Sequence, residues 1–286
     1  MVAQAIDIVD SKFDKYQSLE YKLSILIGMD SFFYLIEDLL ANVLVIKQIE
    51  YNVEEKMGAS QKELVLQRIL MQEKLLQLPY ANVAICYSSP RFTLVPNELF
   101  YKHQLQDYLE QVTRIRKKEE VAMCPVKKLD ATLIYGIDKI ELDVAKSYFP
   151  GAKHLHIIAP LLLYARQYAK AQKGYQVFAH VGKGIVGVLL YKQDNLKLVN
   201  TYTYKTEKDF LYHVLKIYEQ FDLDPELIPT VLSGRIQKKS ELYDQLNTYV
   251  RHLNILQSPS YYQYGPAFQD VNFHFYMDLL SISLCE

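Results

Sequence analysis

Apolar residues in the first fifth of the chain gather in short runs that are separated by polar turns. Three such runs lie at residues 23–27, 32–36 and 43–46, and they are rich in β-branched and aromatic side chains. Short runs of this composition, joined by short connections, predict three consecutive antiparallel strands. Residues 35–42 also contain Leu, Glu and Ala, which favour helix, so a helical segment there is the alternative.

After these strands, helical and extended patterns alternate along the chain. The predicted elements are, in order, a helix at 60–78, a strand at 81–87, a helix at 97–112, a charged connection at 114–120, a strand at 130–137, a helix at 139–148, a strand at 154–159 and a helix at 160–172. Strands that alternate with helices in this way favour parallel pairing, with the helices covering the sheet.

The same order of elements then returns. The second set comprises strands at 176–181, 185–193 and 196–204, a helix at 206–221, a strand at 230–232, a helix at 240–249, a strand at 253–256 and a closing helix at 270–284. Each half therefore reads as three strands, a helix, a strand, a helix and a strand, although the halves share no evident residue-level identity. This order predicts an α/β protein with two ribonuclease-H-like domains, each a mixed sheet flanked by helices. We expect the first domain at 1–172, the second at 173–268, and a C-terminal helix at 269–286 that packs back on the first.

Composition and charge narrow the range of partners. The chain has 32 basic and 33 acidic residues and a net charge of −1, which gives no electrostatic reason to bind nucleic acid. The apolar runs are too short to insert into a membrane, and the N-terminal residues lack the pattern of a signal peptide, so we expect a cytoplasmic protein. Three widely spaced cysteines indicate neither a disulfide framework nor a zinc site.

Three glycine-containing turns carry a resemblance to a known fold family. The turns consist of residues Gly28, Met29, Asp30 and Ser31, residues His180, Val181, Gly182, Lys183 and Gly184, and residues Ser233, Gly234 and Arg235. Together with the duplicated element order, they resemble the actin, heat-shock chaperone and sugar-kinase superfamily. The chain looks most like an uncharacterised bacterial family that is described only as having an actin-like ATPase fold.

The resemblance implies a nucleotide site from which the usual carboxylates are missing. In the superfamily the first turn reads Asp-x-Gly and the second Asp-x-Gly-x-Gly-Thr-Thr, and the adenosine turn ends in Gly-Gly. Here Gly28 and His180 take the two Asp positions, and Arg235 replaces the second Gly of the adenosine turn. Mg²⁺ requires oxygen ligands, which neither Gly28 nor His180 provides.

We therefore expect no catalytic residues, no metal site and no firmly bound cofactor. The resemblance then predicts a protein with a degenerate nucleotide site that acts through a protein partner or as a homodimer. The alternative is an ATP-binding switch or weak ATPase, in which Asp30, Gly182 and Gly184 still hold Mg-ATP between the domains.

Other motifs have simpler readings. Residues 182–187 match G-x-G-x-x-G, but a strand-like run follows them, so a hairpin turn explains them better than a dinucleotide site. His154 and His156 share one face of a predicted strand and are read either as metal ligands or as ordinary hydrogen-bonded histidines. The loop with Tyr261, Tyr262 and Tyr264 either packs the final helix against the first domain or forms an exposed patch for a partner.

Overall fold

The apolar runs near the N-terminus form three consecutive antiparallel strands, as predicted. In the computed structural model, which describes residues 6–51 and 59–285, these strands are β2 (Tyr21–Ile27), β3 (Ser31–Asp38) and β4 (Asn42–Glu50). Residues 35–38 belong to β3, so the helical alternative for this segment is wrong. Both faces of β3 are buried, which explains its nearly continuous apolar sequence.

The chain divides into two units. The N-terminal unit contains the described residues of Val2–Ala159 together with Pro259–Val271, and the C-terminal unit contains Pro160–Ser258 together with Asn272–Cys285. The boundary therefore differs from the expected one at residue 172. The closing segment also differs from expectation, because its side chains bond to the C-terminal unit, as described below.

A mixed sheet forms the centre of the N-terminal unit, with the strand order β1-β4-β3-β2-β5-β9 and β15 also paired to β4. Its further strands are β1 (Asp7–Val9), β5 (Asn82–Tyr87), β9 (Lys153–His156) and β15 (Gln263–Tyr264). Helices α1 (Ala59–Gln72) and α3 (Lys139–Tyr148) lie on one face. On that face, Ile25 and Ile27 line a small apolar cavity with Leu66 and Val144.

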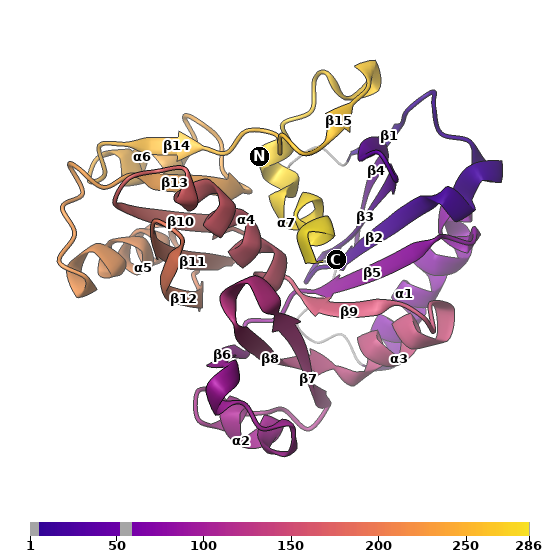
Figure 1. Cartoon of the computed structure of the whole chain (residues 1–286), viewed down its shortest axis with the longest axis horizontal. Helices are drawn as coiled ribbons and strands as arrows, with labels where there is room; N and C mark the ends of the chain where they lie inside the picture. The colour runs from indigo at the N-terminus through magenta and orange to yellow at the C-terminus, as the bar shows by residue number, and fades with distance from the viewer. Residues whose placement is uncertain (1–5, 52–58, 286) are drawn as a thin grey trace. The chain divides into compact units, whose positions relative to one another are not determined.

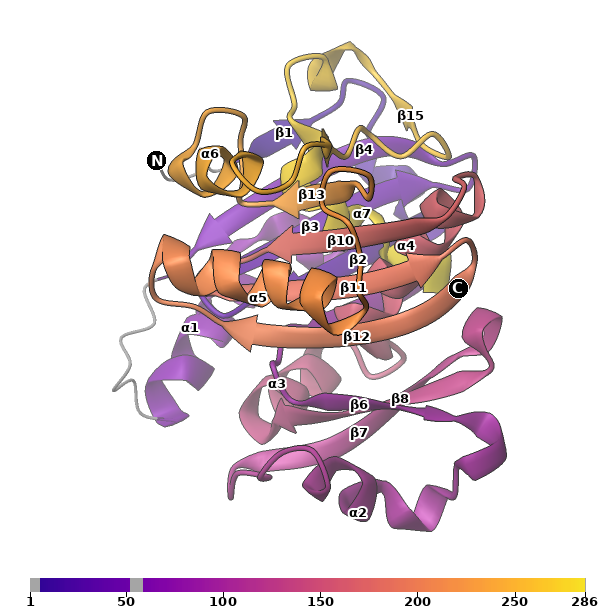
Figure 2. The ribbon, with the colours of Figure 1, turned by 90° about the vertical axis from the view of Figure 1, so that its left-hand side faces the viewer.

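The C-terminal unit repeats this sheet with the order β12-β11-β10-β13-β14 (Figure 1). Its strands are β10 (Tyr175–Val181), β11 (Ile185–Lys192), β12 (Asn195–Thr203), β13 (Thr230–Gly234) and β14 (Leu253–Ile255). Helices α5 (Glu207–Gln220) and α6 (Glu241–Asn247) lie on one face, and Figure 2 shows α5 lying over the face of the sheet. Helix α4 (Ile158–Lys170) packs on the other face, where the rings of Tyr168 and Phe178 meet edge to face at 5.6 Å.

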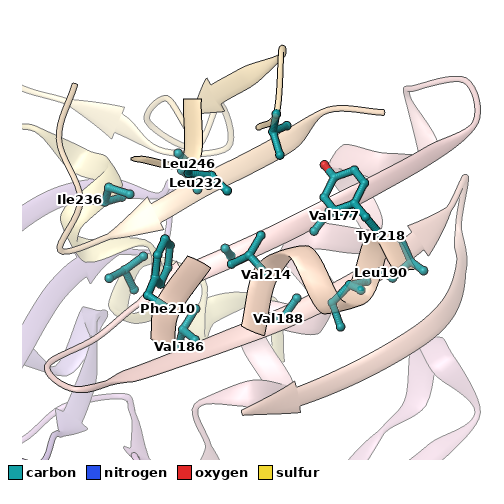
Figure 3. Packing of buried hydrophobic residues seen from close by; sticks show 14 residues of the cluster. Val177, Val186, Val188, Leu190, Phe210, Val214, Tyr218, Leu232, Ile236 and Leu246 are labelled. Atoms are coloured by element: carbon teal, nitrogen blue, oxygen red, sulfur yellow. The ribbon is translucent and has the colours of Figure 1, made fainter. Parts of the chain in front are cut away.

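The apolar side of α5 explains how this unit holds together. Thr206 and Asp209 form a capping box that begins the helix, and Phe210, Val214 and Tyr218 follow at helical spacing. Figure 3 shows these side chains directed at the strand residues beneath them, which include Val186, Val188, Leu190 and Leu232. Burial of each side chain of this size contributes roughly 1.5–3 kcal/mol.

The repeat extends to strand length and to a matched irregularity. The three strands of each meander have 7, 8 and 9 residues in both units. The pairing register shifts between Ile36 and Glu37 in one meander and between Leu190 and Tyr191 in the other. These two bulges occupy the same place in the two sheets, so individual residues of the two meanders can be matched.

A small three-stranded sheet in the N-terminal unit was only partly predicted. Its order is β6-β8-β7, with β6 (Phe92–Pro96), β7 (Glu119–Val126) and β8 (Ala131–Asp138). The sequence predicted β8 but not its neighbours, and the predicted helix at 97–112 is reduced to α2 (Leu105–Glu110) after two 3₁₀ turns, η3 (Asn97–Leu99) and η4 (Lys102–Gln104). Strands β6 and β7 are short or polar at their ends, and pairing with β8 decides their conformation.

The closing segment is helical but not one regular helix. It consists of η7 (Phe273–Tyr276), α7 (Met277–Leu280) and η8 (Ile282–Cys285). The remaining 3₁₀ turns are η1 (Lys15–Glu20), η2 (Lys74–Gln77), η5 (Lys127–Leu129) and η6 (Pro266–Phe268). No helix in the described part of the chain has both the length and the apolar character needed to cross a membrane.

Candidate functional site

The candidate residues fall into two groups, one in each unit. Six of them, His180, Gly182, Lys183, Gly184, Gly234 and Arg235, lie at two turns of the C-terminal unit. The other three, Gly28, Asp30 and Ser31, lie at the first hairpin of the N-terminal unit.

A tyrosine closes the hairpin between β10 and β11. The Gly182 N–H donates to the carbonyl of Ile185 at 2.8 Å, and Gly184 has a positive φ of 67° that favours glycine. The Tyr204 hydroxyl donates to the Gly182 carbonyl at 2.8 Å, while the Tyr204 N–H donates to the Gly184 carbonyl at 3.0 Å. The hairpin is thus held by bonds from within the unit.

The hairpin between β2 and β3 is closed in the same way. The Gly28 N–H donates to the Ser31 carbonyl at 2.8 Å, and the Tyr51 hydroxyl donates to the Gly28 carbonyl at 2.6 Å. The Tyr51 N–H donates to the Asp30 carbonyl at 2.9 Å, and the Ser31 hydroxyl donates to the Asp30 carboxylate at 2.9 Å. Tyr51 and Tyr204 both follow the third strand of their meander directly, which was the signal in the sequence that could have revealed them.

These matched bonds show which residues of the two units are equivalent. They align Gly28 with Gly182, so the residue equivalent to His180 is Leu26, two positions before the glycine. Leu26 is buried, and its strand position puts it on the sheet face opposite α1 and α3. A Cβ at Gly28 would lie 2.8 Å from the Ser31 carbonyl oxygen, so the hairpin has no room for a side chain there.

His180 makes contacts with two polar side chains. Its Nδ1 lies 3.0 Å from the Ser233 hydroxyl, and its Nε2 lies 3.3 Å from a carboxylate oxygen of Asp278 in α7. The His180 and Asp278 side chains are only 11% and 15% exposed. Asp278 was not foreseen from the sequence, because it comes from the far end of the chain.

The turn after β13 depends on a glycine. Gly234 has a φ of 80°, and a Cβ there would lie 2.2 Å from the Val181 carbonyl oxygen. The Arg235 N–H donates to that same carbonyl at 2.6 Å. The equivalent bond in the N-terminal unit runs from the Ser88 N–H to the Ile27 carbonyl at 3.1 Å.

Comparisons with known proteins agree with this duplicated architecture. Residues 10–253 match the family described as "Protein of unknown function (DUF3822)". The chain belongs to this family. A search of curated protein sequences found no match.

Solved structures show the fold of this DUF3822 protein. A Bacteroides thetaiotaomicron protein described as having an actin-like ATPase fold and unknown function superposes with a TM-score of 0.82 at 23% identity, covering 96% of this chain and all of that one. A chain of the PilM-PilN type IV pilus biogenesis complex superposes with a TM-score of 0.61 at 12% identity, covering 93% of this chain and 98% of that one. The ethanolamine utilization protein EutJ from Carboxydothermus hydrogenoformans gives 0.54 at 8% identity, covering 98% and 93%. The predicted actin-like ATPase fold with two ribonuclease-H-like domains is therefore confirmed.

A partly buried charge cluster joins helices α1 and α3 of the DUF3822 protein. Lys62 of α1 contacts Glu141 at 2.7 Å and Asp138 at 3.1 Å, both on α3 or at its start. Burial raises the pKa of Glu141, and Lys62 offsets only part of that rise. For Lys62, burial lowers the pKa, but the two carboxylates outweigh it and the net pKa is raised. The cluster is internally paired and stabilises the contact between the two helices.

The two histidines of β9 are hydrogen-bonded within the N-terminal unit. His154 Nδ1 lies 2.8 Å from the Tyr87 hydroxyl. His156 Nε2 lies 2.8 Å from the Ser89 carbonyl, and its Nδ1 accepts from the Ile158 N–H, so both of its ring nitrogens have partners. Among the described residues, no group of three or more His, Cys, Asp or Glu side chains could hold a metal ion.

The tyrosine-rich loop packs within the N-terminal unit. Tyr262 is buried and its hydroxyl bonds to the Glu37 carboxylate of β3. The adjacent β15 pairs in parallel with the start of β4. Tyr262 therefore belongs to the packing of the first meander and not to an exposed patch.

Proposed function

We propose that this DUF3822 protein is an actin-like-fold protein that does not hydrolyse ATP and that acts through contacts with another protein. The observation that carries the proposal is the pair of residues at equivalent positions in the two units. Leu26 is an apolar side chain, and His180 is engaged by Ser233 and Asp278.

The chemistry of magnesium supports this reading. Mg²⁺ takes oxygen ligands in nearly octahedral geometry and is poorly bound by nitrogen. Neither Leu26 nor His180 offers an oxygen, so these residues do not fit a magnesium-bound nucleotide. The remaining carboxylates near the turns have partners of their own: Asp30 accepts from Ser31, and Asp278 lies against His180.

An interaction role agrees with what one structural neighbour is named for. A chain of the PilM-PilN type IV pilus biogenesis complex superposes on this protein, so a chain of this fold is found in an assembly. A protein partner or a second copy of the chain is the corresponding expectation here. The competing function is an ATP-dependent switch that uses Asp30, Gly182 and Gly184.

Isothermal titration calorimetry with Mg-ATP separates the two functions. We expect no binding heat at ligand concentrations up to about 1 mM, a range in which even weak sites are occupied. The proposal fails if the protein binds Mg-ATP with micromolar affinity and the Gly182→Trp variant loses that affinity. Lys183→Ala is the gentler companion variant, since it changes the same turn without adding bulk beside Ile185.

A further inference from the structure

The two sheets differ at the outer edge of their third strand. In the N-terminal unit, β4 is covered by β1 and β15. In the C-terminal unit, the matched strand β12 ends the sheet, and no strand of the described residues pairs with its outer side. Figure 2 shows β12 as the outermost strand of its sheet.

The bonds on β4 show which backbone groups such an edge presents. The Gln48 N–H donates to the Ile6 carbonyl at 2.8 Å, and the Leu44 carbonyl accepts from the Asp10 N–H at 2.8 Å. Between them, Ile46 lies opposite Ile8. The two meanders share their strand lengths and the position of their bulge. Gln48, Ile46 and Leu44 of β4 therefore correspond to Thr201, Val199 and Lys197 of β12, in that order.

Part of the β12 edge is already satisfied by nearby side chains. The Thr201 N–H donates to the Asn200 side-chain oxygen at 2.8 Å, and the Thr203 carbonyl lies 3.2 Å from His213 Nε2. No hydrogen bond of the described residues takes the outward groups of Val199 and Lys197. Unpaired edge groups of this kind are a template for an added strand.

Side chains around the edge indicate what kind of strand fits. On the side of α5, the rings of Tyr202 and His213 stack at 4.6 Å, and Tyr212 lies beside them, 61% exposed. Val199 points to the other face of the sheet, so these rings offer contact area to the residues of an added strand that flank the one facing Val199. Lys197 is the one charged residue of β12. On β4, Lys47 pairs with a carboxylate of the strand that covers it, Asp7 of β1, at 3.0 Å.

We propose that the outer edge of β12 binds an extended segment of a partner protein as an additional antiparallel strand. The segment places a β-branched residue opposite Val199 and a carboxylate opposite Lys197. β1 already has this pattern: in the register that it uses on β4, Ile8 would face Val199 and Asp10 would face Lys197. Main-chain bonds supply affinity in such a complex, and alternate side chains supply selectivity.

The probe is a peptide with the sequence of residues 6–12, Ile-Asp-Ile-Val-Asp-Ser-Lys. It is added to the full chain. Peptide binding is followed by fluorescence anisotropy and by hydrogen exchange at the β12 amides. At saturating peptide we expect the Val199 amide to exchange about tenfold more slowly, because its N–H acquires a partner. Absence of protection at residues 197–199 up to about 1 mM peptide overturns the proposal.

Two sets of variants test the site itself. Val199→Pro removes the outward N–H at an edge position where proline is tolerated, and should weaken peptide binding about tenfold, while Val199→Thr should bind as the parent does. Lys197→Glu should weaken binding up to about fivefold, and a peptide with Lys in place of Asp10 should restore it. Equal binding by the Val199→Pro and Val199→Thr variants contradicts the proposal, since the peptide would then bind elsewhere, for example at β4.

A second copy of the chain is the competing occupant. If the β12 amides are protected without peptide, and protection rises with protein concentration, the edge is a self-association surface and the proposal is wrong. The inference rests on the proposed function only for the class of partner. The two experiments are independent. A failure of peptide binding would not change the result expected from the Mg-ATP titration, and Mg-ATP binding would not by itself abolish peptide binding.

Discussion

Helices α1 and α5 occupy the same place in the two units but begin differently. Both have 14 residues and cover one face of their sheet. The apolar positions match one to one: Leu66, Ile69 and Leu70 in α1 and Val214, Ile217 and Tyr218 in α5. Four residues before this set, α1 carries Lys62, whereas α5 carries Phe210.

The difference shows that one fold can accept either a charge cluster or an aromatic ring at this point. Lys62 is paired with Glu141 of α3 and with Asp138 at the end of β8, while Phe210 packs among apolar residues of its sheet. Burial of a charge is tolerated only when its partners come with it. The neighbouring helix, not the position itself, therefore decides which residue is allowed.

The largest expected effect comes from moving the charge into the unit that lacks partners. Phe210→Lys places an unpaired ammonium among Val186, Val188 and Leu232, so we expect a loss of more than about 4 kcal/mol in the free energy of unfolding. Urea denaturation measures it, with Phe210→Leu as the control at about 1 kcal/mol. A loss for Phe210→Lys as small as that of the control would mean that the ammonium reaches water.

A pH effect of nearly this size belongs to the N-terminal unit. Burial lowers the pKa of His156 from 6.5 to about 4. The unfolded chain therefore binds more protons between these values, so stability is complete above pH 6.5 and falls as pH decreases towards 4. The loss over this window is about 3 kcal/mol for this residue.

Thermal unfolding across that pH range tests the His156 prediction. His156→Gln keeps a donor for the Ser89 carbonyl and should flatten the pH profile. If the parent and His156→Gln curves run parallel, the buried histidine does not cause the pH dependence.

A smaller loss is expected when the charge cluster is broken. Lys62→Met leaves Glu141 buried without its cation, which should cost roughly 2 kcal/mol, because a quarter of the Lys62 side chain is in contact with solvent. The double variant Lys62→Met/Glu141→Leu should recover most of the loss, since its apolar pair resembles the packing in the C-terminal unit. A double variant that is less stable than Lys62→Met alone would show that the cluster stabilises through Glu141 itself.

The smallest effect tests whether the two tyrosines are equivalent. Tyr51→Phe and Tyr204→Phe each remove one hydrogen bond to a hairpin carbonyl, so each should lose about 1 kcal/mol. Tyr249→Phe, at an exposed tyrosine, should change stability by less than about 0.5 kcal/mol. Loss confined to one of the two tyrosines would end the analogy between the hairpins.

The order of elements could be predicted from the sequence because it depends on local patterns. The strands of the first meander follow from short apolar runs rich in β-branched and aromatic residues, and the alternation of helical and extended patterns along the chain gives the rest of the order. Strands β1, β6 and β15 were missed because they are short, and β7 was missed because it begins with two glutamates; pairing with another strand decides the extended conformation of all four. The predicted closing helix is in fact broken into 3₁₀ and α turns.

The turns that carry the candidate residues were predicted in part. The glycine turns lie at hairpins and strand ends, as expected, and Gly182, Gly184 and Gly234 have the bonds or φ values that their turns require. The register of the first turn was not predictable, because only the matched bonds of Tyr51 and Tyr204 show that Leu26 is the counterpart of His180.

The sequence by itself determined the duplicated α/β order and showed that the side chain at position 180 carries no oxygen. Residue identity and periodicity are local properties. Tertiary structure alone decided that His180 meets Asp278, that Lys62 meets Glu141, and that β4 is covered while β12 is not. Each of these contacts joins segments far apart in the chain. Nothing in a local pattern specifies such a partner, because the free energy of a buried ion pair or an added strand depends on which groups the whole fold brings within bonding distance.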